Sequence, residues 1–379
     1  MKRFLKYLKR MLITIVILIA TMVVAYLLFV NFYPSFGGNV SKADKERYSL
    51  SENHREGAFV NKNRVPEDMS FGEMLKVARK FFFEKVPNAR PENNLEVQKI
   101  DSSAIADYNS PTRLIWFGHS SFLLQMEDKT ILIDPMLDEV PAPHPMLGSK
   151  RFNSEAPIAL EMIPAIDAVI ISHDHYDHLD YKSIKELKDR VEMFYVPLGV
   201  GVHLQAWDVP EDRILELDWW QEVEFKGLTF ACTPAQHFSG RKFNNRMSTL
   251  WSSWVILSDK ERLFFSGDSG YSEHFKDIGN AYGPFDFAMM ECGQYNEKWP
   301  DIHMFPEETA QAGLDVRAQA IMPIHWGAFK LALHEWTDPI IRVQKKASEL
   351  GIPLVTPRIG EPIIINDLPK PQSEWWMEN

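Results

Sequence analysis

The sequence HDHYDH occupies residues 173–178, one residue after the apolar run AVII. A short apolar run of this kind predicts a buried strand, so the histidines and aspartates are expected in the loop at its end. His173 and His175 lie two positions apart, and in an extended segment both imidazoles point to the same side. Asp177 and His178 follow where the sequence turns helical, and they can point to a neighbouring position. Two ligand pairs in one loop suit two metal ions a few ångströms apart.

Two ligand pairs do not fill two coordination spheres, so further ligands are expected elsewhere in the chain. The segment FACTPAQH ends an apolar run at His237, LFFSGDSG places Asp268 after another, and AIMPIHWG places His325 after a third. Each of these residues follows a predicted strand near a turn residue, a position that can bring side chains together at one edge of a sheet. Asp268 has two carboxylate oxygens and is therefore the candidate to bridge both ions.

Strand-like and helix-like stretches are mixed from residue 112 onwards. This mixture predicts sheets covered by helices in one α/β domain. The predicted strands are 114–117, 121–126, 130–133, 168–171, 193–196, 229–233, 252–257, 262–265, 285–290, 320–324 and 362–365, and the predicted helices are 181–187, 306–317 and 339–350.

The ordered set of HDHYDH, His237, Asp268 and His325 resembles the metallo-β-lactamase fold superfamily over about residues 110–366. Within it, the sequence is similar to the branch that contains N-acyl-phosphatidylethanolamine-hydrolysing phospholipase D. The segments that carry this second resemblance are WFGHSSFLLQMEDKTILIDPML, LDWWQEVEF, TPAQHFSGR, LWSSWVI, FFSGDSGY and HMFPEETAQAG. A membrane anchor at the N-terminus is a departure from that branch, whose enzyme holds membranes peripherally.

The resemblance implies an αββα sandwich with a site for two zinc ions at one edge. The implied ligands are His173, His175 and His237 for one ion, Asp177, His178 and His325 for the other, and Asp268 as a bridge. Asp134, at the end of TILID, matches an early aspartate of the family that orients a metal-binding histidine. The alternative for Asp134 is a turn aspartate before Pro135. The histidine-rich ligand set also favours zinc, with manganese and iron as alternatives.

A centre of this kind predicts hydrolysis, because two metal ions lower the pKa of water and stabilise charge that develops on substrate oxygens. Asp177 and Asp268 are the predicted catalytic carboxylates, and Asp177 is the candidate to orient the attacking water. The resemblance places His303, in DIHMFPEE, near the substrate as a catalytic and substrate-binding candidate. His119 in GHSS and Tyr295 in CGQYNEKW are further substrate-binding candidates, with a packed, hydrogen-bonded histidine as the alternative for His119.

Residues 11–30 form a run without a charged side chain, and about 20 apolar residues span a bilayer as a helix. Five basic residues precede the run, which predicts a cytoplasmic N-terminus and an extracytoplasmic remainder. A cleaved signal peptide is the alternative. The predicted organisation is a basic N-terminus over 1–10, a transmembrane anchor over 11–30, a tether and helical extension over 31–109, and a hydrolase domain over 110–379. Within the extension, residues 67–84 predict an amphipathic helix that packs on the domain.

The sequence therefore predicts a membrane-anchored, zinc-dependent phosphodiesterase of phospholipase D type, acting on lipids that resemble N-acyl-phosphatidylethanolamine. A lactonase is the alternative, because the same hydroxide attacks a carbonyl carbon and the substrate would be another small ester. A membrane protein that binds metal without catalysis is the third reading. The sequence makes no prediction of oligomeric state.

Composition limits the partners and the redox chemistry. The net charge of −11 disfavours a nucleic-acid partner, which would need a basic face. Cys232 and Cys292 form no CxxC metal motif and are expected to be buried free thiols, with one disulfide as the alternative. Arg241, after QHFSG, is expected at the surface, with a contact to a substrate phosphate as the alternative.

Overall fold

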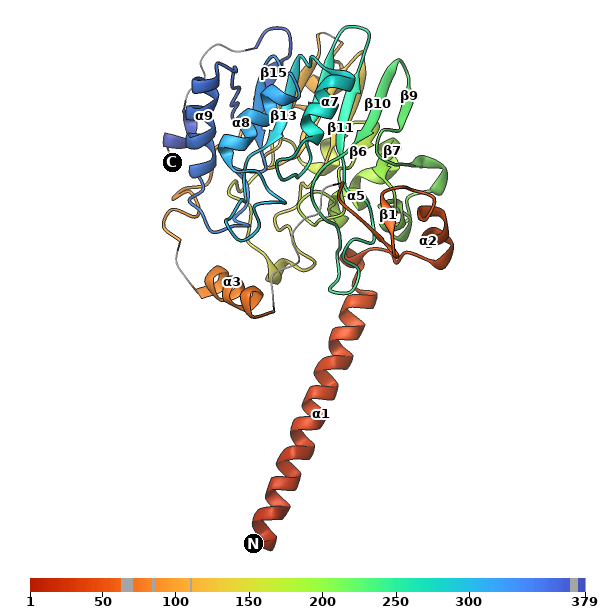
Figure 1. Ribbon diagram of the computed structural model, residues 1–379, viewed down its shortest axis with the longest axis vertical. Coiled ribbons are helices and arrows are strands. Elements are labelled where there is room, and N and C mark those ends of the chain that lie inside the picture. The colour runs from red at the N-terminus through yellow and green to blue at the C-terminus, as the bar shows by residue number, and fades with distance from the viewer. Residues whose placement is uncertain (63–70, 84–85, 110, 369–373, 379) are drawn as a thin grey trace.

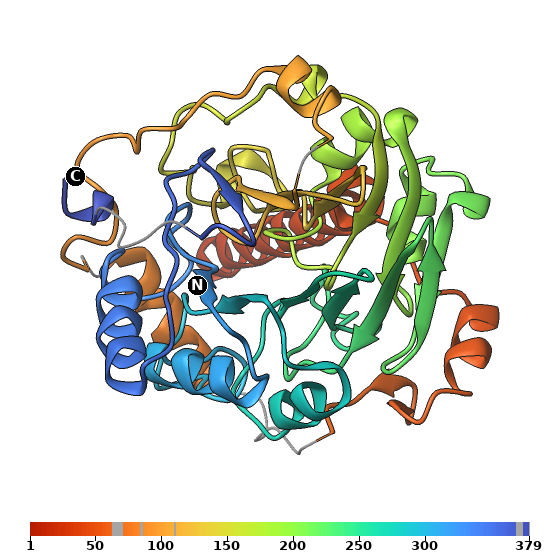
Figure 2. The ribbon, with the colours of Figure 1, turned by 90° about the horizontal axis from the view of Figure 1, so that it is seen from above.

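The computed structural model describes residues 1–62, 71–83, 86–109, 111–368 and 374–378. Two sheets form the body of the protein, and helices cover them (Figure 1, Figure 2). The arrangement confirms the predicted αββα sandwich.

The first sheet has seven strands among the described residues, in the order β15-β3-β4-β5-β6-β7-β8. The strands are β3 (Arg113–Trp116), β4 (Phe122–Met126), β5 (Lys129–Ile133), β6 (Ile166–Ile170), β7 (Val191–Pro197), β8 (Ile214–Leu217) and β15 (Pro362–Ile364). Pairing is antiparallel from β15 to β5 and parallel from β5 to β8. β3, β5 and β6 therefore run in the same direction, and their carboxyl ends lie at one edge of the sheet.

The second sheet has six strands in the part of the chain that the structure describes, in the order β14-β13-β12-β11-β10-β9. The strands are β9 (Glu222–Phe225), β10 (Leu228–Thr233), β11 (Ser253–Leu257), β12 (Arg262–Phe265), β13 (Phe287–Glu291) and β14 (Ile321–Ile324). Pairing is antiparallel from β9 to β12 and parallel from β12 to β14. The carboxyl ends of β10, β12, β13 and β14 therefore also share one edge.

Successive side chains of a strand point to opposite faces, and this alternation builds the layers. On β4, Phe122 and Leu124 belong to the large apolar core shared with the second sheet. Leu123 belongs instead to the apolar cluster beneath α5 (Tyr181–Leu187) and α6 (Gly201–Ala206). Helices α7 (His274–Tyr282), α8 (Pro306–Asp315) and α9 (Asp338–Leu350) cover the second sheet (Figure 1).

Helix α1 (Lys2–Phe32) projects away from the sandwich, and Val30 is its buried residue (Figure 1). This helix is long and apolar enough to cross a membrane. It includes the predicted 11–30 anchor and continues to Phe32. The basic residues before the apolar run lie on the same helix.

Residues 34–61, which the sequence places in a tether, pack against the sandwich. They form α2 (Lys42–Tyr48), β1 (His54–Arg55) and β2 (Ala58–Phe59). Tyr48 and Phe59 are buried in the large core, 0% and 1% exposed. These two aromatic side chains help to fix the segment to the domain, since each removes a large apolar surface from water.

The predicted amphipathic helix corresponds to α3 (Phe71–Phe83), and residues 67–70 and 84 lie outside the described residues. The short helix α4 (Ser102–Ala106) then leads to β3. Cys232 and Cys292 are buried free thiols, as predicted. Short 3-10 turns lie at Pro34–Phe36, Pro145–Leu147, Leu160–Met162, Lys188–Arg190, Glu211–Arg213 and Trp375–Glu378.

Candidate metal centre

The predicted ligands converge at the edge where strand ends of both sheets meet. The first sheet supplies HDHYDH in the loop after β6, and α5 begins just beyond it, where the Asp180 side chain accepts from the Ser183 amide at 2.7 Å. The second sheet supplies His237 after β10, Asp268 after β12 and His325 after β14. The seven predicted ligand residues lie in two clusters of His and Asp side chains.

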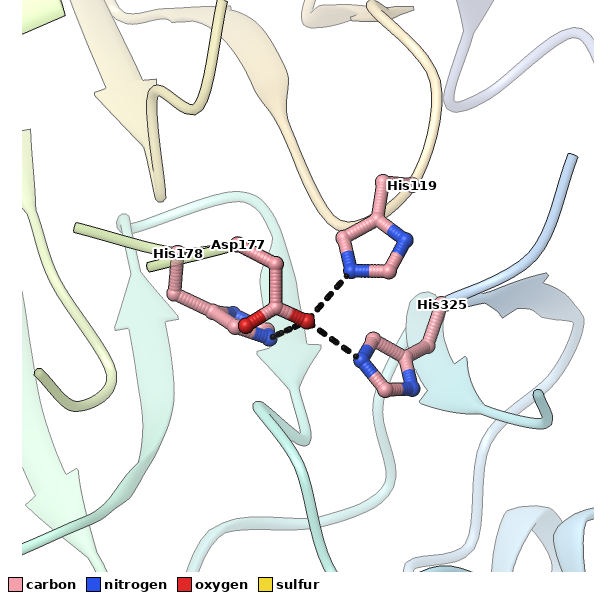
Figure 3. Close-up of side chains that lie close together, drawn as sticks. All are labelled: His119, Asp177, His178 and His325. Carbon is pink, nitrogen blue, oxygen red and sulfur yellow. Dashed lines mark hydrogen bonds and ion pairs between the residues drawn. The ribbon is translucent and has the colours of Figure 1, made fainter. Parts of the chain in front are cut away.

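The first cluster, here called the Asp177 cluster, consists of His119, Asp177, His178 and His325 (Figure 3). Oδ2 of Asp177 is its centre. It lies 2.9 Å from His119 Nε2, 3.1 Å from His325 Nε2 and 3.7 Å from His178 Nε2. One carboxylate oxygen therefore faces three imidazole nitrogens from three different strand ends.

The second cluster, here called the His173 cluster, consists of His173, His175, His237 and Asp268. Nδ1 of His175 lies 2.9 Å from His173 Nε2 and 3.2 Å from His237 Nε2. Oδ2 of Asp268 lies 3.8 Å from His173 Nε2 and 3.7 Å from His237 Nε2. Three imidazole nitrogens thus converge beside one carboxylate.

Asp268 connects the two clusters. Its Oδ1 lies 3.1 Å from His178 Nε2 and its Oδ2 lies 3.1 Å from His325 Nε2, both in the Asp177 cluster. A tight turn at Gly267 positions Asp268 between the two clusters. Gly267 has φ 57°, and a Cβ on it would lie 2.6 Å from the carbonyl oxygen of Ser252. Glycine adopts this left-handed backbone without a steric penalty, which explains the glycine before Asp268.

The residues fit a pair of divalent metal ions. In each cluster the candidate ligand atoms lie within 4.8 Å of one another. Imidazole and carboxylate are the donors that zinc, manganese and iron share. The buried atoms His178 Nε2 and Asp268 Oδ1 lie 3.1 Å apart, and neither has a well-aligned hydrogen bond among the described residues, although buried polar atoms in proteins are almost always paired. A cation held between them would bind both.

The electrostatics of the His173 cluster keep its imidazoles neutral. Burial lowers the pKa of His173, and the neighbouring His178 and His175 lower it further. Burial also lowers the pKa of His175 to about 4 and that of His237 well below its ordinary value. A neutral imidazole has a lone pair for a metal ion, so these three side chains need lose no proton before binding one.

The carboxylates of Asp268 and Asp177 stabilise positive charge on the neighbouring imidazoles. Burial raises the pKa of Asp268, but His178 and His325 more than reverse this and hold it well below its ordinary value. Burial lowers the pKa of His325, whereas Asp268 and Asp177 raise it, with a net pKa of about 10. The pKa of His178 is raised for the same reason. A bound ion would take the place of the protons on these two imidazoles.

Asp134, predicted to orient a histidine, lies at the end of β5 and is fully buried. Its Oδ2 lies 2.7 Å from His178 Nδ1 and 2.5 Å from the Ser172 hydroxyl, and its Oδ1 accepts from the Ser172 amide at 2.7 Å. Because the carboxylate accepts at Nδ1, His178 presents Nε2 to the centre.

His303 lies next to the centre. Its ring stacks on that of His325 with centroids 5.1 Å apart, and it forms a third His/Asp group with Asp268 and His325. Its Nδ1 lies 3.2 Å from Oε1 of Glu291, a fully buried carboxylate at the end of β13. The same oxygen lies 3.4 Å from His325 Nδ1. Glu291 therefore orients two histidines, and sequence reasoning missed it.

The three remaining candidates, His119, Tyr295 and Arg241, are buried. His119 is fully buried and belongs to the Asp177 cluster, so its polar contact is with a candidate ligand. Tyr295 is outside both clusters, because its hydroxyl bonds to Asp338 and its ring stacks on His334. Arg241, expected at the surface, is 3% exposed, and this expectation was wrong.

Arg241 is buried because it ties the loop after His237 to the N-terminal segment. Its guanidinium donates to the carbonyl of Ser35 at 2.7 Å and to that of Leu179 at 2.8 Å, and it lies over the ring of Tyr176. The Tyr176 ring also contacts Phe36 edge-on at 6.4 Å. The 3-10 turn that follows α1, Pro34–Phe36, is thus bound directly to the HDHYDH loop.

Asn61, also missed from the sequence, holds the backbone of His237. Its Nδ2 donates to the His237 carbonyl at 2.9 Å, and its Oδ1 accepts from the His237 amide at 3.1 Å. Oδ1 also accepts from Trp251 Nε1 at 3.0 Å. The residue lies in a polar stretch without periodicity, and no pattern there indicates this role.

We expect Asn61→Ala to weaken metal binding about 10- to 100-fold, the range for groups that orient a ligand without touching the ion. The alanine removes both bonds to the His237 backbone, whereas Trp251 Nε1 keeps its bond to the Ala235 carbonyl at 3.0 Å. Competition with a chromogenic chelator would measure the affinity. Asn53→Ala is the control. Asn53 lies in the same N-terminal segment as Asn61, but its side chain bonds to Asp218, which is not a candidate ligand. Equal affinities of the Asn61→Ala protein and the unchanged protein would contradict the expectation.

The sandwich and the clustered His and Asp side chains at its edge define a metal-dependent hydrolase class. A family model described as "Beta-lactamase superfamily domain" matches residues 129–326. The chain therefore belongs to the metallo-β-lactamase superfamily of metal-dependent hydrolases.

Relatives and solved structures agree with this assignment. An uncharacterized protein of Mycobacterium tuberculosis is 38% identical over 86% of this chain and 87% of its own length. The N-acyl-phosphatidylethanolamine-hydrolyzing phospholipase D 1 of Caenorhabditis elegans is 31% identical over 69% of this chain and 76% of its own. The solved structure of Igni18, a metallo hydrolase from Ignicoccus hospitalis, superposes with a TM-score of 0.51 at 20% identity, covering 67% of this chain and 98% of that one. This last likeness shows the fold.

Proposed function

We propose that the chain is a membrane-anchored phosphodiesterase of phospholipase D type, with two zinc ions, that acts on lipids resembling N-acyl-phosphatidylethanolamine. The observation that carries the proposal is Asp268, whose two oxygens face both clusters at once. Two adjacent sites suit an in-line displacement at phosphorus, where attacking and leaving oxygens both need stabilisation. The relationship to the phospholipase D of Caenorhabditis elegans supports the same chemistry.

The roles follow from the geometry of the two clusters. His173, His175 and His237 would hold one ion, Asp177, His178 and His325 the other, and Asp268 both. Bound zinc ions supply a water of lowered pKa and stabilise charge on the substrate's oxygens. Asp177 accepts from His119 and, through its other oxygen, can orient a water. His303 can hold a proton at Nε2, because Glu291 occupies its Nδ1.

The membrane part of the proposal rests on α1. Its apolar stretch is long enough to span a bilayer, and the basic residues before it favour a cytoplasmic N-terminus with residues 110–379 as an extracytoplasmic hydrolase domain. The contacts of Phe36 and Arg241 hold this domain close to the end of the helix. A lipid substrate then needs to diffuse only within the plane of the membrane.

We expect the full chain, reconstituted with phosphatidylethanolamine and its N-acyl form, to produce phosphatidic acid from the N-acyl lipid. Mass spectrometry of the lipid extract would measure the product. A chelator should abolish the formation of phosphatidic acid, and added zinc should restore it, because the bound ions would supply the attacking water. A lactone and a water-soluble phosphodiester serve as comparison substrates. A metal-loaded protein that cleaves the lactone and neither phosphodiester would overturn the proposal.

A further inference from the structure

The end of α1 contacts two loops of the catalytic domain. The rings of Phe29 and Tyr33 lie 6.3 and 5.5 Å from the ring of His144, and the ring of Tyr26 lies 6.3 Å from that of Phe243. Tyr26 and Phe29 belong to the apolar run 11–30. If this run spans a bilayer, side chains that touch it lie at the membrane–water boundary.

The same two loops expose large apolar side chains. Phe243 is 91% exposed, Met146 86% and Leu147 59%, and Phe32 at the end of α1 is 78% exposed. Single exposed apolar residues are ordinary, but a group of them beside a transmembrane helix marks an interaction surface. These four residues, Phe32, Met146, Leu147 and Phe243, are here called the apolar rim.

The loop with Met146 and Leu147 is held in place. Both residues lie in the 3-10 turn Pro145–Leu147, and Nδ1 of His144 accepts from the Met146 amide at 3.1 Å. His144 thus caps the turn and packs against α1 with the same ring. The apolar side chains are therefore presented at a fixed position relative to the anchor.

The Phe243 loop connects the rim to the metal centre. Phe238, five residues before Phe243, has its ring 4.5 Å from that of His175 and 4.8 Å from that of His237. The guanidinium of the exposed Arg246 lies over the Phe238 ring at 4.0 Å. The segment 238–243 therefore reaches from the candidate ligands to the end of α1. Arg246 adds a positive charge beside this segment, which would attract a lipid phosphate.

Helix α3 lies at the same end of the domain as the emergence of α1 (Figure 1). Its Lys76, Arg79 and Lys80 are exposed, and so is Leu75. Basic side chains with an exposed leucine suit the headgroup region of a bilayer.

We propose that the apolar rim inserts into the boundary of the bilayer that α1 spans, so that lipid reaches the metal centre along the Phe243 loop. The inference rests on the proposed function for its anchor and deepens it, because it assigns a fixed orientation of the domain on the membrane. The occupant of the surface is the bilayer itself.

Single cysteines carrying an environment-sensitive fluorophore test the proposal in the full chain. The native thiols Cys232 and Cys292 are buried, so a label goes to an introduced cysteine. The positions are Phe243→Cys and Met146→Cys in the rim, Leu18→Cys in the middle of α1, and Ile341→Cys on α9 as an exposed apolar control (Figure 1). Vesicles with brominated acyl chains should quench the label at 18, 243 and 146, and leave that at 341 unchanged.

Each result has one meaning. Quenching at 18 without quenching at 243 and 146 would overturn the rim while α1 stays in the bilayer. Absence of quenching at all positions would overturn both the transmembrane position of α1 and the insertion of the apolar rim. Phosphatidic acid formation is measured separately, so failure of the lipid chemistry is distinguished from failure of the surface. As a functional readout, Phe243→Ser should lower the rate on vesicle lipid and leave that on a water-soluble phosphodiester unchanged.

Discussion

Replacing Asp268 with alanine should abolish hydrolysis and remove most of the bound metal. Loss of an outer group that orients a ligand costs about 10- to 100-fold in metal affinity or activity, and a bridging ligand should cost more. The two oxygens of Asp268 face imidazoles of both clusters, and the side chain is only 2% exposed. Elemental analysis after dialysis would give the metal content, and lipid mass spectrometry the rate.

Two further variants make the Asp268 result specific. Asp268→Asn keeps the shape and removes the charge, and it should also lose metal, because the neutral amide no longer balances two cations. Asp277→Ala is the control: this aspartate is on α7, is 42% exposed and pairs with Lys62. A dialysed Asp268→Ala protein with the full metal content would show that Asp268 is not a ligand.

Replacing Asp134 with alanine should destabilise the fold itself. The fully buried carboxylate bonds to His178 and to both the amide and hydroxyl of Ser172. Leaving a buried donor without its acceptor costs about 1–3 kcal/mol, and the alanine leaves the His178 Nδ1 and Ser172 amide donors without theirs. Urea unfolding of the full chain in detergent, followed by tryptophan fluorescence, would measure the loss in free energy of unfolding.

Asp134→Asn separates the two roles of Asp134. The backbone there is left-handed, with φ 41°, and asparagine adopts this conformation more readily than most residues. The asparagine should therefore recover part of the stability, while metal affinity stays low because the amide is a weaker acceptor for His178. Equal stability of the alanine variant and the unchanged protein would contradict the structural role.

The sequence predicts the strands that contain an apolar run and misses β8 and β9, which lack one. β5 and β6 end in the continuous apolar runs 131–133 and 168–170, which are buried because both faces of the sheet are covered there. β9 (EVEF) alternates glutamate with apolar residues and β8 (ILEL) is interrupted by a glutamate, and each lies at one edge of its sheet. Half-exposed edge strands of four residues leave a pattern too short to distinguish from a polar loop.

The site shows the same limit. Ligands at strand ends are predictable, because each follows an apolar run. Glu291 had this signal too, at the end of FAMME, and could have been found. Asn61 and Arg241 could not have been found in this way. Their bonding partners are distant in the chain: His237 lies 176 positions from Asn61, and Ser35 lies 206 positions from Arg241. Polar residues that act through the backbone of a distant segment leave no local pattern.

The distribution of the centre along the chain determines when it can form during synthesis. Asn61 leaves the ribosome long before its partner His237, and His325 follows later still. The loop after β6 therefore exists for much of translation as a group of histidines and aspartates without its counterpart from the second sheet. Metal capture with the full ligand set therefore cannot precede the synthesis of His325, which comes long after that of α1.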